Sequence, residues 1–95
     1  MTGDSCRDAV VVFWRSSSAP CCAMTPAFER LARDFPALTV VRIDMHAAPR
    51  AAERYDVVSV PTAIRFHHRV PAVAGVGVMA YEELLDRLCL SPPRC

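Results

Sequence analysis

The decisive stretch of the chain is residues 9–21, which read Ala-Val-Val-Val-Phe-Trp-Arg-Ser-Ser-Ser-Ala-Pro-Cys. Its first part, Ala9 to Trp14, is a continuous apolar and β-branched run, typical of a strand that is buried on both faces of a sheet. In its last part, Ser18 is a good N-cap for a helix that begins at Ala19 and has a proline in its first turn. The stretch therefore predicts a buried strand that leads directly into a helix.

The rest of the chain continues this alternation. The first helix carries an apolar stripe at Met24, Phe28, Leu31 and Phe35 and is expected to end before Pro36. The further elements expected are a strand at 39–44, a short helix at 49–55, a hairpin of strands at 62–66 and 70–76 joined across 67–69, and a helix over 81–88. The order β-α-β-α-β-β-α predicts an α/β domain, a mixed four-strand sheet covered by helices on both faces. We divide the chain into a short N-terminal segment (1–8), this domain (9–90) and a flexible tail (91–95).

Composition and charge exclude several classes of protein. Apolar residues make up 53% of the 95 residues and charged residues 22%, which suffices for one small folded domain. The net charge of +1, with both signs interspersed, argues against binding to nucleic acid or to a membrane surface through bulk charge. The longest apolar run is far shorter than the roughly 20 residues that span a bilayer. Five cysteines, an odd number, and an N-terminus without a signal-peptide pattern suit a reducing compartment, so we expect a cytoplasmic protein.

A set of short segments follows a recognisable order and spacing. They are Val-Val-Val-Phe-Trp at 10–14, Ser-Ala-Pro-Cys at 18–21, Pro-Ala-Phe-Glu-Arg-Leu-Ala at 26–32, Val-Arg-Ile-Asp at 41–44, Tyr-Asp-Val-Val-Ser-Val-Pro-Thr at 55–62, and Gly77. Together these segments resemble the thioredoxin family, and the resemblance covers roughly residues 9–89. It implies the thioredoxin fold and a role in thiol–disulfide chemistry.

The resemblance breaks down at the reactive motif. In the family, a Cys-Gly-Pro-Cys motif begins the first long helix; its first Cys attacks a disulfide and its second resolves the mixed disulfide. Ser18 stands at the first of these positions and Cys21 at the second, and a serine cannot form a disulfide. Val12 stands where many members have a buried acid, and Ser17 where a tryptophan usually precedes the first Cys. The ordinary dithiol cycle is therefore not expected, and at most a single-thiol exchange through Cys21 or Cys22 remains.

Each of these cysteines also has a plain structural interpretation. Cys21 is either a retained redox thiol or a small buried apolar residue. Cys22 is either a substitute nucleophile near a helix N-terminus or a tolerated surface thiol. The residues thus leave two functions open, a weak thiol–disulfide oxidoreductase or a non-catalytic module that uses the fold to bind polypeptide or another subunit. For Cys89 and Cys95, free thiols are expected rather than a disulfide.

The binding groove of the family is better retained. Pro61 matches the family's cis-proline, which faces the active site and leaves the preceding residue, Val60, to pair its backbone with an extended chain. Gly77 matches a small residue on the rim of the same groove, and Ala19 and Pro20 lie inside the motif. The expected partner is therefore an extended polypeptide or the thiol of a partner protein.

Neither a cofactor nor a metal is expected. The three histidines, His46, His67 and His68, do not combine with the cysteines in a zinc-ligand spacing, and the last two are predicted to lie on a hairpin away from Cys21. The arginines at positions 15, 65 and 69 are expected to form a solvated surface rather than an anion site.

The beginning of the domain departs from the family as well. Family domains usually have a strand and a helix before the first buried strand, whereas only eight residues precede Ala9. Either the domain is a minimal four-strand version, or the start of the gene was assigned too late. Without that first strand, Thr39–Asp44 would form an open, valine-rich edge, so we expect weak self-association through it.

Overall fold

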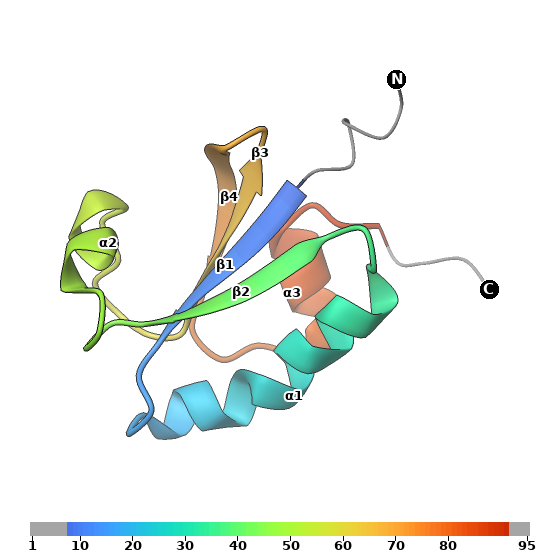
Figure 1. Cartoon of the computed structure of the whole chain (residues 1–95). Coiled ribbons are helices and arrows are strands. Elements are labelled where there is room, and N and C mark those ends of the chain that lie inside the picture. Colours follow the sequence, from blue (N-terminus) through green and yellow to red (C-terminus); the bar gives the residue numbers. More distant parts are fainter. Residues whose placement is uncertain (1–7, 92–95) are drawn as a thin grey trace.

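Seven helices and strands make up residues 8–91, the part of the chain that the structure, a computed structural model, describes. In chain order they are β1 (Asp8–Trp14), α1 (Ala19–Asp34), β2 (Thr39–Asp44), α2 (Pro49–Arg54), β3 (Thr62–His67), β4 (Val70–Val76) and α3 (Tyr81–Arg87). The order and the mixed sheet confirm the predicted fold class (Figure 1). β1 begins at Asp8, one residue before the expected domain boundary, and the expected tail lies mostly outside the described residues.

The sheet has the strand order β2-β1-β3-β4. β1 pairs in parallel with β2, with Trp14 opposite Asp44, and antiparallel with β3, with Phe13 opposite Thr62. β3 and β4 form an antiparallel hairpin in which Thr62 lies opposite Val76. The parallel pair needs a long crossover, and α1 supplies it.

The two faces of the sheet are covered unequally. α1 and α3 lie on one face (Figure 1), where the strand side chains Val10 and Val12 are fully buried in a cluster with Met24, Phe28 and Leu31. On the opposite face, the much shorter α2 covers a smaller cluster around Phe13, Ala52, Val57 and Ile64. Val11, on that face, is only half-buried. The expected burial of β1 on both faces is thus complete at Val10 and Val12 under α1 and α3 and at Phe13 on the α2 face, and partial at Trp14 and Val11.

The turn of the hairpin is shorter than expected. His67 belongs to β3, so only His68 and Arg69 connect the two strands. Both have positive φ values, 51° and 69°, as in the type I′ turns whose twist matches that of the strands they join. The sequence lacks the Asn-Gly pair that usually announces such a turn, which explains why sequence reasoning places the loop one residue too early.

A polar contact joins the end of α1 to the start of α3. The Tyr81 hydroxyl donates to Asp34 Oδ2 at 3.0 Å, and the Arg30 guanidinium lies 4.2 Å from the centre of the Tyr81 ring. Burial, together with the hydrogen bond to the Asp34 carboxylate, raises the pKa of Tyr81 to about 12. The phenol therefore stays neutral at physiological pH and keeps the two helices in contact.

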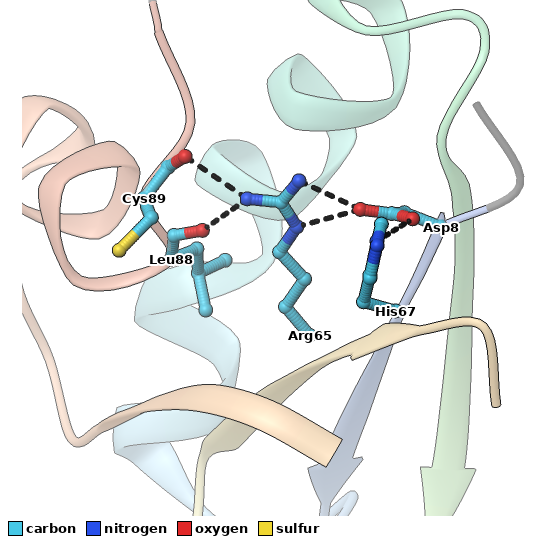
Figure 2. Close-up of polar contacts among 5 residues, drawn as sticks. All are labelled: Asp8, Arg65, His67, Leu88 and Cys89. Atoms are coloured by element: carbon cyan, nitrogen blue, oxygen red, sulfur yellow. Dashed lines mark hydrogen bonds and ion pairs between the residues drawn. The ribbon is translucent and has the colours of Figure 1, made fainter. Parts of the chain in front are cut away.

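Arg65 connects the sheet to the end of α3 (Figure 2). Its Nε and Nη2 donate to Asp8 Oδ2 at 3.0 and 2.6 Å, and its Nη1 donates to the carbonyl oxygens of Leu88 and Cys89 at 2.9 Å each. His67 Nδ1 donates to the other carboxylate oxygen of Asp8 at 2.8 Å. The prediction of a solvated Arg65 is therefore wrong, because its guanidinium satisfies carbonyl groups that the helix end leaves free. Arg15 and Arg69 are exposed.

Asp8 is the anionic centre of this network. Burial raises the pKa of its carboxyl, but the hydrogen bonds from Arg65 and His67 and their charges outweigh that effect and hold the pKa below its ordinary value of 3.8. A carboxyl with a lowered pKa in the folded state stabilises the fold above its unfolded-state pKa. That contribution is lost as the pH falls through the lower folded-state value.

We predict that Asp8→Asn lowers the free energy of unfolding by about 1–3 kcal/mol near neutral pH, because it removes the charge that Arg65 faces. The difference from the original chain should shrink as the pH falls from about 5 towards about 2, where Asp8 itself becomes neutral. Urea unfolding followed by circular dichroism across this range measures both effects.

The matched control is Glu83→Gln, which removes an exposed ion pair with Arg87 on α3 (Nη2 to Oε2, 3.4 Å). Exposed pairs of this kind contribute less than about 1 kcal/mol. A difference between Asp8→Asn and the original chain that stayed constant with pH would contradict the role of the Asp8 carboxylate.

Candidate functional site

The candidate site lies at one end of the sheet. β1 ends there and leads into α1, β3 begins there, and β4 ends there, as the pairing of Phe13 with Thr62 and of Thr62 with Val76 requires. The segments 18–21, 60–61 and 76–77 therefore all lie at this end of the sheet. His67 lies opposite Asp8 at the other end of the strands, so the hairpin histidines are far from Cys21 and Cys22.

Ser18 is the N-cap of α1. Its backbone is extended, with φ −87° and ψ 122°, and its Oγ accepts the backbone N–H of Cys21 at 3.4 Å. Its carbonyl oxygen accepts the N–H of Cys22 at 3.2 Å. Pro20 occupies the first turn, where no backbone donor is needed. The predicted cap is confirmed, and Ser18 stabilises the start of the helix that carries both cysteines.

The two neighbouring cysteines differ in exposure. Cys21 is only 3% exposed, and its Sγ accepts the backbone N–H of Arg15 at 3.4 Å. Its carbonyl oxygen accepts the Thr25 hydroxyl at 3.2 Å. Cys22 is exposed, because consecutive residues of a helix point in directions about 100° apart. Both thiols are free, so Cys22 is the thiol of this pair that a partner can reach.

Pro61 and Gly77 form the other side of the site. The Val60–Pro61 peptide bond is cis, Pro61 is fully buried, and Val60 is half-buried. The Gly77 N–H donates to the Pro61 carbonyl oxygen at 2.9 Å, which joins the two loops. Gly77 has a φ of +91°, and no heavy atom lies within 4 Å of where its Cβ would be. Glycine is therefore required there for its backbone conformation rather than for space.

Exposed valines flank these two loops, a feature that the sequence reasoning missed. Val58, Val76 and Val78 are 93%, 58% and 59% exposed. Each lies within three residues of Pro61 or Gly77, so the chain beside both loops exposes apolar side chains. The repeated Val-x-Val pattern at 58–60 and 76–78 was a visible signal, but it also suits buried strands. Exposed apolar surface of this kind is typical of a site that binds another chain.

The described part of the chain offers little else for chemistry at this end. Among residues 8–91, no three His, Cys, Asp or Glu side chains come together as a group that could hold a metal ion.

None of the helices described here is both long and apolar enough to cross a membrane. Cys89 is exposed and free within this range, whereas Cys6 and Cys95 lie outside it.

Comparison with known proteins agrees with this geometry. The family model "Thioredoxin" matches residues 3–88. The thioredoxin of Chlamydia trachomatis is 33% identical over 84 residues, covering 86% of this chain and 82% of the relative. A thioredoxin of Staphylococcus aureus is 32% identical over 80 residues, covering 83% and 77%. The crystal structure of Fasciola hepatica thioredoxin superposes with a TM-score of 0.81 at 23% identity and covers 93% of this chain and 84% of that one.

The fold and the site thus define an α/β protein with the thioredoxin fold, in which the first helix begins at the same end of the sheet as a cis-proline loop. With the family model and the relatives that match, the chain belongs to the thioredoxin family. The general role of that family is thiol–disulfide redox chemistry with the thiols of partner proteins.

We predict that an alkylating reagent modifies Cys22 at least about a hundredfold faster than Cys21 in the folded protein, because a buried thiol reacts only after local opening. Timed labelling with iodoacetamide, followed by peptide mass mapping, measures both rates in one sample. Cys22→Ala should remove the fast modification at this site, and Cys21→Ala should leave it. Equal rates for the two thiols before denaturation would contradict the structure of the helix start.

Proposed function

We propose that this thioredoxin-family protein carries out single-thiol exchange at a degenerate site, with Cys22 as the reacting thiol. The observation that carries the proposal is the exposure of Cys22 on the first turns of α1, next to Ser18 at the position of the lost nucleophile. Cys21, the other candidate, is buried and accepts a backbone N–H. We expect this chemistry in the cytoplasm, where thiols stay reduced.

Each turn of the exchange uses the Cys22 thiol of the protein and one external small thiol. The Cys22 thiolate attacks a partner disulfide, forms a mixed disulfide with one partner sulfur and expels the other as a thiolate. A small thiol of the glutathione class then attacks the partner sulfur of the mixed disulfide and releases Cys22. After this turn one partner sulfur is a free thiol, and the other remains in a disulfide with the small thiol. A second small thiol must attack that disulfide to reduce the remaining partner sulfur, and the two small thiols leave as their own disulfide.

The partner is expected to bind as an extended polypeptide across the site. Val60 precedes the cis-proline, and its backbone is the group expected to pair with a partner strand. The exposed side chains of Val58, Val76 and Val78 supply apolar contacts on either side. Ala19 and Pro20, both exposed, complete the edge formed by α1. A partner segment with apolar side chains around its cysteine suits this surface best.

A second function is favoured by the same helix start. Ser18 serves as a helix cap, and Cys21 is packed like a small apolar residue. Both features suit a non-catalytic module that binds polypeptide or another subunit through the fold alone. In that case Cys22 is a surface thiol without a role.

We predict that Ser18→Cys creates dithiol activity that the original chain lacks. The introduced thiol and Cys21 would be spaced as in the family motif, so the insulin-reduction rate with dithiothreitol should rise at least about tenfold. The loss of the cap should cost about 1 kcal/mol of stability, which thermal unfolding measures. Ser18→Ala is the matched control: it loses the cap equally and gains no activity. Insulin reduction by the original chain well above the uncatalysed rate would overturn the proposal that Ser18 disables the cycle.

The two functions are separated by trapping the mixed disulfide. We predict that oxidised glutathione forms a mixed disulfide at Cys22, seen as a mass increase on the peptide that contains it. Cys22→Ser should abolish the adduct on this peptide, whereas Cys21→Ser should retain it. Non-reducing pull-downs with the same variants then report protein partners. Partners captured equally by Cys22→Ser would instead support the binding module.

A further inference from the structure

β2 is an edge strand in the part of the chain that the structure describes. The Met45 N–H donates to the Trp14 carbonyl oxygen at 2.9 Å and continues the parallel ladder to β1. Backbone groups alternate in direction along a strand, so those of Val41 face β1 and those of Val40 and Arg42 face the open edge. Within residues 8–91 no strand pairs with these N–H and C=O groups, so they can pair with a strand of another copy.

The other edge, β4, is much less suited to pairing. It contains Pro71, which lacks a backbone donor, and its register with β3 shifts at a bulge between Arg65 and Phe66. Prolines and bulges are the features with which natural proteins block sheet edges. β2 has neither, and its single basic residue, Arg42, lies on the α1 face of the sheet. Of the two edges of the sheet in residues 8–91, β2 is therefore the one at which the addition of another strand is favoured.

An apolar surface adjoins β2 on the α2 face. Val41, on the edge, is 42% exposed. Beside it lies a groove of about 390 Å³ over β1, β2 and β3. It is lined by Ala9, Val11, Phe13, Ile43, Tyr55, Phe66 and Arg69. This groove lies on the α2 face, where the short α2 leaves part of the sheet uncovered. The free edge and the exposed apolar side chains thus belong to one continuous surface.

We propose that two copies of this chain associate by antiparallel pairing of β2 with the β2 strand of the partner subunit, with Val41 on the two-fold axis. In antiparallel pairing about a two-fold axis, both copies contribute the same surface to the interface. A second copy of β2 therefore offers the open edge and the exposed valine that the first copy offers. Val41 would then contact the partner's Val41, and Ile43 the partner's Thr39, all on the α2 face. The net charge of +1 adds little repulsion between copies.

The register follows from the backbone groups that are free. A register centred on Ile43 would place Arg42 opposite the partner's Asp44, and would need the Asp44 carbonyl oxygen as an acceptor. That oxygen already accepts the N–H groups of Ala47 and Ala48 at 3.0 Å each. The register centred on Val41 uses the free groups of Val40 and Arg42 instead. The inference does not depend on the thiol chemistry proposed above.

Light scattering coupled to size-exclusion chromatography, under reducing conditions, tests the association from about 10 μM to about 1 mM protein. The mass is expected to double from 10.5 kDa as the concentration rises. Val41→Lys would place like charges opposite each other and should weaken the dimer at least about tenfold. Val70→Lys, at an exposed valine on the other edge strand, is the matched control and should still dimerise. Circular dichroism confirms that both variants fold. A monomer at all concentrations, or a dimer that Val70→Lys disrupts and Val41→Lys does not, overturns the proposal.

Cross-linking tests the register. Val41 and the partner's Val41 would be a non-hydrogen-bonded pair with Cα atoms about 4.5 Å apart, a distance that a disulfide can span. In a chain whose Cys6, Cys22, Cys89 and Cys95 are replaced by serine, Val41→Cys should form a covalent dimer rapidly under mild oxidation. Ile43→Cys should do so at least about tenfold more slowly, because the two copies of residue 43 would lie two residues from the axis on opposite sides. Faster cross-linking at residue 43 would overturn the register.

Discussion

The burial of β1 is the constraint on which the rest of the structure depends. Val10, Val12 and Phe13 are completely buried, and side chains of this strand contribute to both apolar clusters. Each such side chain stabilises the fold by about 1.5–3 kcal/mol through the hydrophobic effect. Because β1 also pairs with β2 and β3, its position determines where the sheet ends. The site lies at that end because α1 begins only five residues after Trp14.

Ser18 connects stability with chemistry at this site. A helix begins with backbone N–H groups that have no partner inside the helix, and the Ser18 hydroxyl satisfies one of them. A cysteine at the same position could react with disulfides but would be a poor cap. In the proposed function, a single residue therefore gives the helix a stable start and leaves the exchange of thiols to the exposed Cys22.

Contacts between distant residues decide how the elements are held together. Arg65 on β3 reaches Asp8 on β1 and the carbonyl groups at the end of α3. Asp8 is 57 residues away from Arg65 in the sequence, and Leu88 is 23 residues away. The guanidinium satisfies these groups in several directions at once, which a lysine could not do. Cys89, one of the two residues whose carbonyl oxygens Arg65 binds, has a φ of 55° just beyond the helix. No local pattern around Arg65 distinguishes it from a surface arginine.

The sequence by itself determined the order of the elements, the cap at Ser18 and the end of the sheet where the candidate site lies. These follow from local signals, since the apolar run at 9–14, the stripe of α1 and the prolines act on neighbouring residues. The sequence also indicated that Cys22 faces solvent, and the structure confirms it. Only the tertiary structure decided how deeply Cys21 is buried, that Arg65 is bound rather than solvated, and that the α2 face is partly open. Burial and long-range hydrogen bonds depend on which elements pack against each other, and a single sequence read in short windows does not contain that information.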